Sequence, residues 1–224
     1  MKILVLGGGV VGVTTAYHLL KDGHEVSVID RQGPAMGGAS YGNAGLIAPG
    51  HAYAWASPKA LKTLLQSLIH KDPTFKMRLR LDPQLIGWGL KFLRECNEAA
   101  VKRNGLSKHQ LCVFSQQVLG QTVKETGVQY QRNTGGVLYL FRSPETLKAG
   151  VINLQTLRED GQVLEVIDTR RVMEIDQTLA HMQDRISGAV FSPTDESGNS
   201  FLFTVNLWKV CEEMGGTFED NTTI

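Results

Sequence analysis

The stretch that most constrains the fold is ILVLGGGVVG near the start of the chain, where a short apolar run meets glycines at fixed offsets. Gly7, Gly9 and Gly12 give the pattern G-x-G-x-x-G. In this pattern the first glycine allows a tight turn, the second lets the backbone approach a pyrophosphate, and the third lets the following helix pack closely. The stretch therefore predicts a strand, a turn and a helix that together cradle a dinucleotide.

The residues on either side of the turn have the pattern of a βαβ unit. Residues 2–6 are a largely apolar run, which is expected to form a strand buried on both faces of a parallel sheet. Apolar residues recur at helical spacing over 10–20, and Gly23 stands where a helix would end. Residues 25–30 (EVSVID) predict a second strand. We therefore expect a compact βαβ unit with a right-handed crossover.

An acidic residue closes the predicted second strand. Asp30 stands roughly 20 positions after the last glycine of the turn, where a carboxylate can grip the ribose hydroxyls of a dinucleotide. The predicted cofactor-binding residues of this unit are Asp30 and the five residues of the turn, Gly7, Gly9, Val10, Val11 and Gly12. Flavin and nicotinamide cofactors share this cradle, so the turn alone does not say which one is bound.

A second motif narrows the choice of cofactor. The stretch ILVLGGGVVGVTTAYHLLKDGHEVSVIDR, followed by SYGNAGLIAPG, resembles the FAD-dependent D-amino acid oxidase superfamily, and most closely its bacterial D-amino acid dehydrogenase small-subunit branch. The segments TGGVLYLFRS and PTDESGNSFLFT resemble the same branch. The resemblance implies FAD, with Arg31 near the adenosine end and with five residues beside the flavin pyrophosphate and ring, Ser40, Asn43, Ala44, Gly45 and Leu46. The alternative interpretation of this loop is an Asn-Gly-rich surface turn.

The resemblance also implies an activity. A D-amino acid would lose hydride to the flavin, the imino acid would hydrolyse to a 2-oxo acid and ammonia, and the electrons would pass to a respiratory acceptor. The residues themselves identify no catalytic group. His51 is predicted to be a surface loop histidine, and Asp195 and Glu196 are predicted to form a turn before a helix.

Aromatic residues could line a substrate site or a core. Tyr139 and Phe141 alternate with leucines, so they form either a floor for substrate or, as we favour, ordinary sheet core. Trp55 and Trp88 are predicted to be packing residues rather than flavin contacts.

Composition and charge narrow the partners and the compartment. Lys and Arg number 23 and Asp and Glu 22, so no strong net charge attracts nucleic acid. The three cysteines have no metal-ligand spacing, and we predict neither a disulfide scaffold nor a metal site. No secretory signal or run of about 18 apolar residues is present. We expect a cytoplasmic protein. Peripheral association with the inner membrane is the alternative that the sequence leaves open.

The rest of the chain predicts an α+β region. Helices are expected over 57–69, 83–101, 107–125, 143–159, 170–175 and 201–214, and strands over 127–132, 135–141, 162–168, 188–193 and from 217. The fold class is therefore α/β, a Rossmann-like FAD-binding βαβ unit with an α+β substrate domain. The predicted domains are the first part of the FAD domain (1–56), a helical segment with a partial substrate domain (57–189), and a return to the FAD domain (190–224).

The resemblance covers only the first half of the longer family members. We therefore expect a fold that is incomplete at its C-terminus, with an exposed apolar sheet edge and an unfinished core. Three hypotheses about function remain open. The chain is the N-terminal portion of an amine-oxidising flavoenzyme, or an inactive or partner-dependent FAD-binding module, or an NAD-dependent dehydrogenase. The loop at 40–47 disfavours the third.

Overall fold

The computed structural model describes residues 1–33, 35–58, 60 and 82–223. It divides into two compact units. Unit 1 comprises Met1–Ala48, Ser115–Val137 and Pro193–Ile224, and unit 2 comprises Pro49–Phe114 and Leu138–Ser192. The helix predicted over 57–69 lies largely outside the described residues. None of the helices in the described part of the chain has the length and hydropathy needed to span a membrane.

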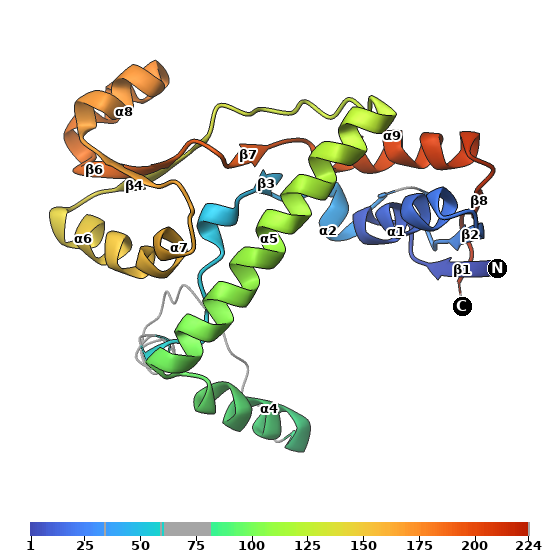
Figure 1. Cartoon of the computed structure of the whole chain (residues 1–224), viewed down its shortest axis with the longest axis horizontal. Helices are drawn as coiled ribbons and strands as arrows, with labels where there is room; N and C mark the ends of the chain where they lie inside the picture. Colours follow the sequence, from blue (N-terminus) through green and yellow to red (C-terminus); the bar gives the residue numbers. More distant parts are fainter. Residues whose placement is uncertain (34, 59, 61–81, 224) are drawn as a thin grey trace. The chain divides into compact units, whose positions relative to one another are not determined.

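Unit 1 contains the predicted βαβ start. Strand β1 (Lys2–Leu6), helix α1 (Val10–Lys21) and strand β2 (Glu25–Ile29) follow one another, and β1 and β2 pair in parallel (Figure 1). Helix α1 ends as predicted, because Gly23 has a φ of +80° and its N–H donates to the carbonyl of Leu20. The sheet order is β1-β2-β8, where β8 (Thr217–Glu219) is the strand expected from residue 217. The α/β fold class is confirmed.

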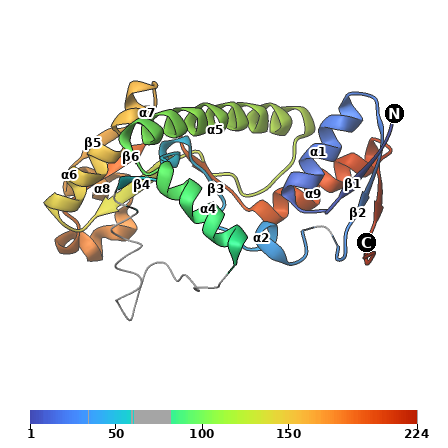
Figure 2. The ribbon, with the colours of Figure 1, turned by 90° about the horizontal axis from the view of Figure 1, so that it is seen from below.

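One face of this sheet carries the core of unit 1. Helix α9 (Ser200–Glu213) and α1 lie beside each other and pack on the side of the sheet that presents Val26 and Val28 (Figure 2). The prediction that β1 is buried on both faces is wrong, because the side chains of Leu4 and Leu6 are 55% and 63% exposed. They alternate with the inward-facing side chains and, at the edge strand, lie on the face opposite the helices.

Helix α5 (Glu98–Thr126) differs from its prediction, because a single helix replaces a break expected between 101 and 107. Gly105 is buried inside this helix, and a Cβ at its position would lie 3.9 Å from the side chain of Thr156, an ordinary contact distance. The break lies earlier, after α4 (Pro83–Arg94). There the side chain of Asn97 accepts a hydrogen bond from the N–H of Ala100 at 2.9 Å and caps α5.

The strand predicted over 127–132 is also wrong. The segment is irregular, with an isolated bridge between Asn133 and Ser197. Its carbonyls accept hydrogen bonds from α9 and from the N-cap residue of α9, Asn199, instead of from a neighbouring strand. The N–H of Asn199 donates to the carbonyl of Tyr130 at 2.7 Å, and the side chain of Asn206 donates to the backbone carbonyl of Gln129 at 2.8 Å. Apolar alternation alone could not reveal these partners.

Unit 2 is built on a second three-stranded sheet with the order β4-β6-β5, formed by β4 (Val137–Phe141), β5 (Glu165–Ile167) and β6 (Gly188–Ser192). Strands β5 and β6 are antiparallel. The helix predicted over 143–159 is interrupted at Leu154, which separates α6 (Pro144–Asn153) from α7 (Gln155–Glu159). Next come α8 (Thr169–Ile175) and the 3-10 helix η2 (Gln177–Arg185). The remaining predicted helices and strands of both units are confirmed within one to three residues at their ends.

Candidate functional site

The glycine turn has the geometry that its spacing predicted. Gly7 has a φ of +106°, and its N–H donates to the carbonyl of Ile29 at 2.8 Å, which ties the turn to the end of β2. A Cβ on Gly12 would lie 1.8 Å from the carbonyl oxygen of Gly7. Only glycine therefore fits at position 12 without moving the backbone of the turn.

The N-terminus of α1 presents backbone N–H groups. Gly9 is the N-cap residue and offers no side chain to cap the helix. The N–H of Val10 donates to the hydroxyl oxygen of Ser40 at 2.9 Å. The N–H groups of Val11 and Gly12 have no acceptor among the described residues. These N–H groups and the helix dipole favour an anion at this end of α1.

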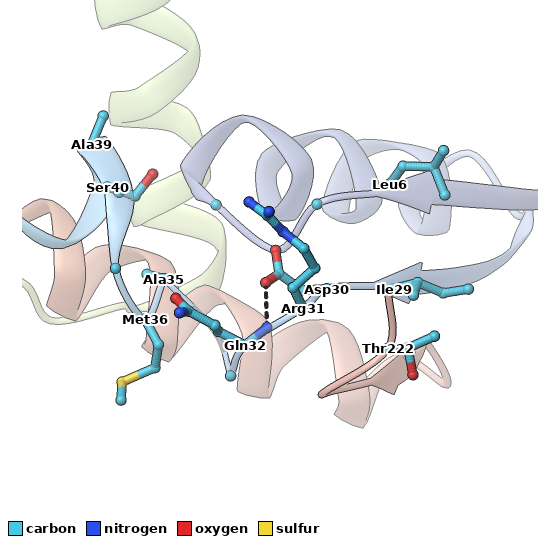
Figure 3. Close-up of a pocket in the computed structure, with 15 residues that line it drawn as sticks. Leu6, Ile29, Asp30, Arg31, Gln32, Ala35, Met36, Ala39, Ser40 and Thr222 are labelled. Carbon is cyan, nitrogen blue, oxygen red and sulfur yellow. Dashed lines mark hydrogen bonds between the residues drawn. The ribbon is translucent and has the colours of Figure 1, made fainter. Parts of the chain in front are cut away.

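A pocket of about 610 Å³ lies beside this turn (Figure 3). Three stretches of the chain and one residue near the C-terminus contribute its lining: Leu6, Gly7, Gly9, Ile29, Asp30, Arg31, Gln32, Gly33, Ala35, Met36, Gly37, Gly38, Ala39, Ser40 and Thr222. The volume is in the range of pockets that bind cofactors and small molecules. The glycines leave much of this wall as bare backbone.

Asp30 organises one wall of the pocket. One oxygen of its carboxylate accepts the N–H of Gly8 at 2.5 Å. The other accepts the N–H of Gln32 at 2.8 Å (Figure 3). Each carboxylate oxygen keeps a further lone pair, so these two bonds still allow Asp30 to accept from a ligand hydroxyl. Arg31 is exposed at the same wall and forms no ion pair with the acidic residues of the described ranges.

The pocket brings together five of the predicted cofactor-binding residues. Gly7, Gly9, Asp30, Arg31 and Ser40 line it, and Val10, Val11, Gly12, Asn43, Ala44, Gly45 and Leu46 do not. Sequence reasoning missed the lining residues at 32–33 and 35–39 and Thr222. The glycines at 33, 37 and 38 were the available signal, since Gly37 and Gly38 both have positive φ. Nothing in the sequence placed Thr222 there.

Asn43 shapes the loop after Ser40. Its side-chain nitrogen donates to the carbonyl of Ala39 at 2.9 Å, and its side-chain oxygen accepts the N–H of Gly45 at 2.7 Å. Gly45 has a φ of +61° and is followed by β3 (Leu46–Ile47), which pairs with β7 (Glu196–Ser197). Ala44 and Leu46 are exposed. In this structure the polar groups of Asn43 are therefore directed to its own loop.

The other candidates do not line this pocket. In unit 2, His51 is exposed, lies 3.0 Å from the hydroxyl of Tyr53 and stacks on Tyr139. Tyr139 and Phe141 pack against the core of unit 2, which confirms the favoured interpretation as sheet core. Trp55 and Trp88 are 74% and 57% exposed, so the prediction that they are packing residues is wrong. The ring of Trp88 stacks on the ring of Phe92, which lies on the same helix, α4.

The pair Asp195 and Glu196 also differs from its prediction. The turn precedes Asp195, which is fully buried, and Glu196 lies in β7. The carboxylate of Glu196 accepts two hydrogen bonds from the guanidinium of Arg132, at 2.6 and 2.8 Å. Sequence spacing could not reveal the ion pair of Arg132 and Glu196, because these two residues are far apart in the chain.

A charged cluster joins α1 to α5 within unit 1. The carboxylate of Glu125 accepts hydrogen bonds from Lys21 at 2.6 Å and from the hydroxyl of Tyr17 at 2.9 Å. Hydrogen bonds from Lys21, Gln121 and Tyr17 lower the pKa of Glu125 to about 2. Burial, followed by the bond to Glu125, raises the pKa of Tyr17 to about 12. The cluster ties the far end of the cradle helix to its neighbour.

The chain is similar to known proteins over its whole length. The model of the family described as FAD dependent oxidoreductase (DAO) matches residues 2–224. The chain is 43% identical to D-amino acid dehydrogenase 2 of Mesorhizobium japonicum, over 100% of the chain and 54% of that protein. It is 37% identical to D-amino acid dehydrogenase of Phenylobacterium zucineum, over 100% of the chain and 53% of that protein. The chain thus spans about half the length of the curated relatives it matches.

A solved structure matches the fold. Glycine oxidase from Geobacillus kaustophilus superposes with a TM-score of 0.62 at 17% identity, covering 99% of this chain and 46% of that one. At this level of identity the similarity concerns the fold.

Proposed function

Because the chain belongs to the FAD-dependent oxidoreductase (DAO) family, we propose that the pocket of unit 1 holds the pyrophosphate and adenosine part of FAD. The residues present fit that group. A Cβ on Gly9 would lie 3.0 Å from the hydroxyl oxygen of Ser40, so glycine leaves open the space beside the helix N-terminus. Two N–H groups there lack acceptors in the described part of the chain, and a phosphate would supply them.

Individual residues then have distinct tasks. The hydroxyl oxygen of Ser40 accepts from Val10, so its proton is available to a phosphate oxygen. The N–H groups of Val11 and Gly12 would donate to the same anion. Asp30 would accept from ribose hydroxyls, and Arg31 would lie along the adenosine. For Asn43, Ala44, Gly45 and Leu46, contact with FAD remains a proposal drawn from the sequence. The predicted domain boundaries also remain a proposal.

We propose further that the whole protein oxidises the amine of D-amino acids to 2-oxo acids and ammonia and passes electrons to an acceptor of the respiratory chain. The observation that carries this proposal is the 43% identity to a D-amino acid dehydrogenase across the full chain. FAD supplies the hydride acceptor for such a reaction. The residues of this chain bind and orient it, and no acid or base among the described residues of the pocket is assigned a proton transfer.

A second candidate is a FAD-binding module that needs another chain to become active. The observation that favours it is the coverage of about half of each curated relative. Both candidates share the cofactor and differ in turnover. An NAD-dependent dehydrogenase is the third alternative, and the family match argues against it.

Purification of the 224-residue chain and its absorption spectrum test the cofactor. The visible absorption bands of a bound flavin would be expected for FAD, and a colourless protein that instead binds NAD would overturn the proposal. Turnover of D-amino acids with an artificial dye as electron acceptor separates the two remaining candidates. Binding of FAD without turnover supports the partner-dependent module, and turnover supports the dehydrogenase.

A further inference from the structure

The loop that carries Asn43 and Gly45 is held from behind by a short antiparallel ladder. Leu46 of β3 is paired with Ser197 of β7, and Ile47 with Glu196. On its other side β7 bonds to Asn133, whose N–H donates to the carbonyl of Ser197 at 2.8 Å and whose carbonyl accepts from Ser197 at 2.9 Å. Strand β7 is therefore the middle member of a small ladder in unit 1, with β3 on one side and the isolated bridge to Asn133 on the other.

Two glycines set the spacing of this ladder. The N–H of Gly198 donates to the carbonyl of Gly45 at 2.9 Å, and a Cβ on Gly45 would lie only 1.9 Å from the carbonyl oxygen of Gly198. A Cβ on Gly198 would in turn lie 2.4 Å from the ring of Tyr130, a side chain that is 3% exposed. Gly45, Gly198 and the Tyr130 ring thus form a stack with no room for a methyl group.

Charge fastens β7 to the same neighbouring segment. Arg132 binds both oxygens of Glu196 through Nε and Nη2, at 2.6 and 2.8 Å, and the Glu196 side chain is only 12% exposed. A bidentate pair of this kind fixes orientation as well as distance. From α5, the side chain of Gln116 donates to the carbonyl of Thr194 at 2.7 Å, just before β7.

The ladder reaches the pocket through Asn43. Its side chain accepts from Gly45 and donates to the carbonyl of Ala39, a residue that lines the pocket beside Ser40. Ser40 bonds to the N-terminus of α1. A continuous set of hydrogen bonds and close contacts therefore joins β7 to the wall of the pocket.

We propose that Arg132 and Glu196 are positioning residues for the loop at 39–45. Their ion pair holds β7, and the stack at Gly45 and Gly198 then fixes the positions of Ala39 and Ser40. Neither Arg132 nor Glu196 lines the pocket. The inference rests on the proposed binding of FAD, but the position of the loop is measurable without FAD.

The test compares Arg132→Ala and Arg132→Lys with Arg171→Ala in the full chain. Arg171 forms an exposed pair with Glu174, with side chains 56% and 46% exposed, and serves as the matched control. We expect Arg132→Ala to raise the dissociation constant for FAD about tenfold, as when an outer partner of a binding site is removed. Lysine keeps the charge but loses the fork, so it should recover only part of the affinity.

Hydrogen exchange without added FAD provides the independent measurement. In Arg132→Ala the peptides that cover 43–47 and 196–199 should exchange faster, while the peptide covering α1 should stay as in the parent. A uniform increase over unit 1 would mean general destabilisation and would overturn the proposal, as would an exchange pattern equal to that of Arg171→Ala. If the parent chain binds no FAD, the proposed function fails, and the exchange result still decides the positioning role.

Discussion

The substitution Gly12→Ala tests the cradle most directly. The new Cβ would lie 1.8 Å from the carbonyl oxygen of Gly7 and 3.0 Å from its carbonyl carbon. Carbon and oxygen atoms that are not bonded do not approach closer than about 3 Å, so the turn and α1 must separate by roughly 1 Å or more. The atom in the way is backbone, which cannot rotate aside like a side chain. We therefore expect the whole turn to move.

The expected magnitude follows from two opposing effects. Alanine in place of glycine inside a helix gains about 1 kcal/mol, and forced overpacking of backbone costs about 3 kcal/mol or more. The net loss is about 2 kcal/mol in the free energy of unfolding. The displaced N–H groups of Val11 and Gly12 should weaken FAD binding by at least as much, which is about 30-fold in the dissociation constant.

Gly120→Ala is the matched control. Gly120 also lies inside a helix of unit 1, α5, and a Cβ there would have no neighbour within 4 Å. This variant should be neutral or up to about 1 kcal/mol more stable. Urea unfolding followed by circular dichroism gives the stability, and fluorescence titration with FAD gives the affinity. If Gly12→Ala matches Gly120→Ala in both measurements, the close approach of turn and helix is not what position 12 requires.

Three further predictions concern unit 1. Ser40→Ala should raise the dissociation constant for FAD about tenfold, because it removes the hydroxyl proposed to donate to a phosphate oxygen, and an unchanged titration would contradict the assignment. Glu125→Gln should flatten the loss of stability on acidification: the native pKa of about 2 lies below the ordinary 4.5, so the parent loses this contribution as pH falls from about 4.5 towards 2. Acid unfolding curves that coincide would argue against it. Tyr17→Phe should lessen the loss of stability above pH 10, since the raised pKa of about 12 favours the neutral phenol in the fold, and alkaline unfolding curves measure it.

Local signals in the sequence determined the first part of the fold. The order of apolar run, three glycines and helical spacing is sufficient to predict β1, the turn, α1 and β2, because each depends on neighbours close in the chain. The same locality explains the failures. A break was predicted between 101 and 107, yet α5 runs unbroken through these residues. Residues 127–132 alternate like a strand, yet their carbonyls bond to Asn199 and Asn206.

The site divides in the same way. Gly7, Gly9 and Asp30 were predictable, since a turn that approaches phosphate needs specific residues at fixed spacing, and Ser40 followed from the family resemblance. Only the tertiary structure decided that Thr222 reaches the pocket, and that Glu196 pairs with Arg132 in support of the loop. These contacts join residues distant in sequence, and no periodicity encodes them. The sequence alone thus determines that a dinucleotide cradle forms, and the packing of distant segments determines the shape of its wall.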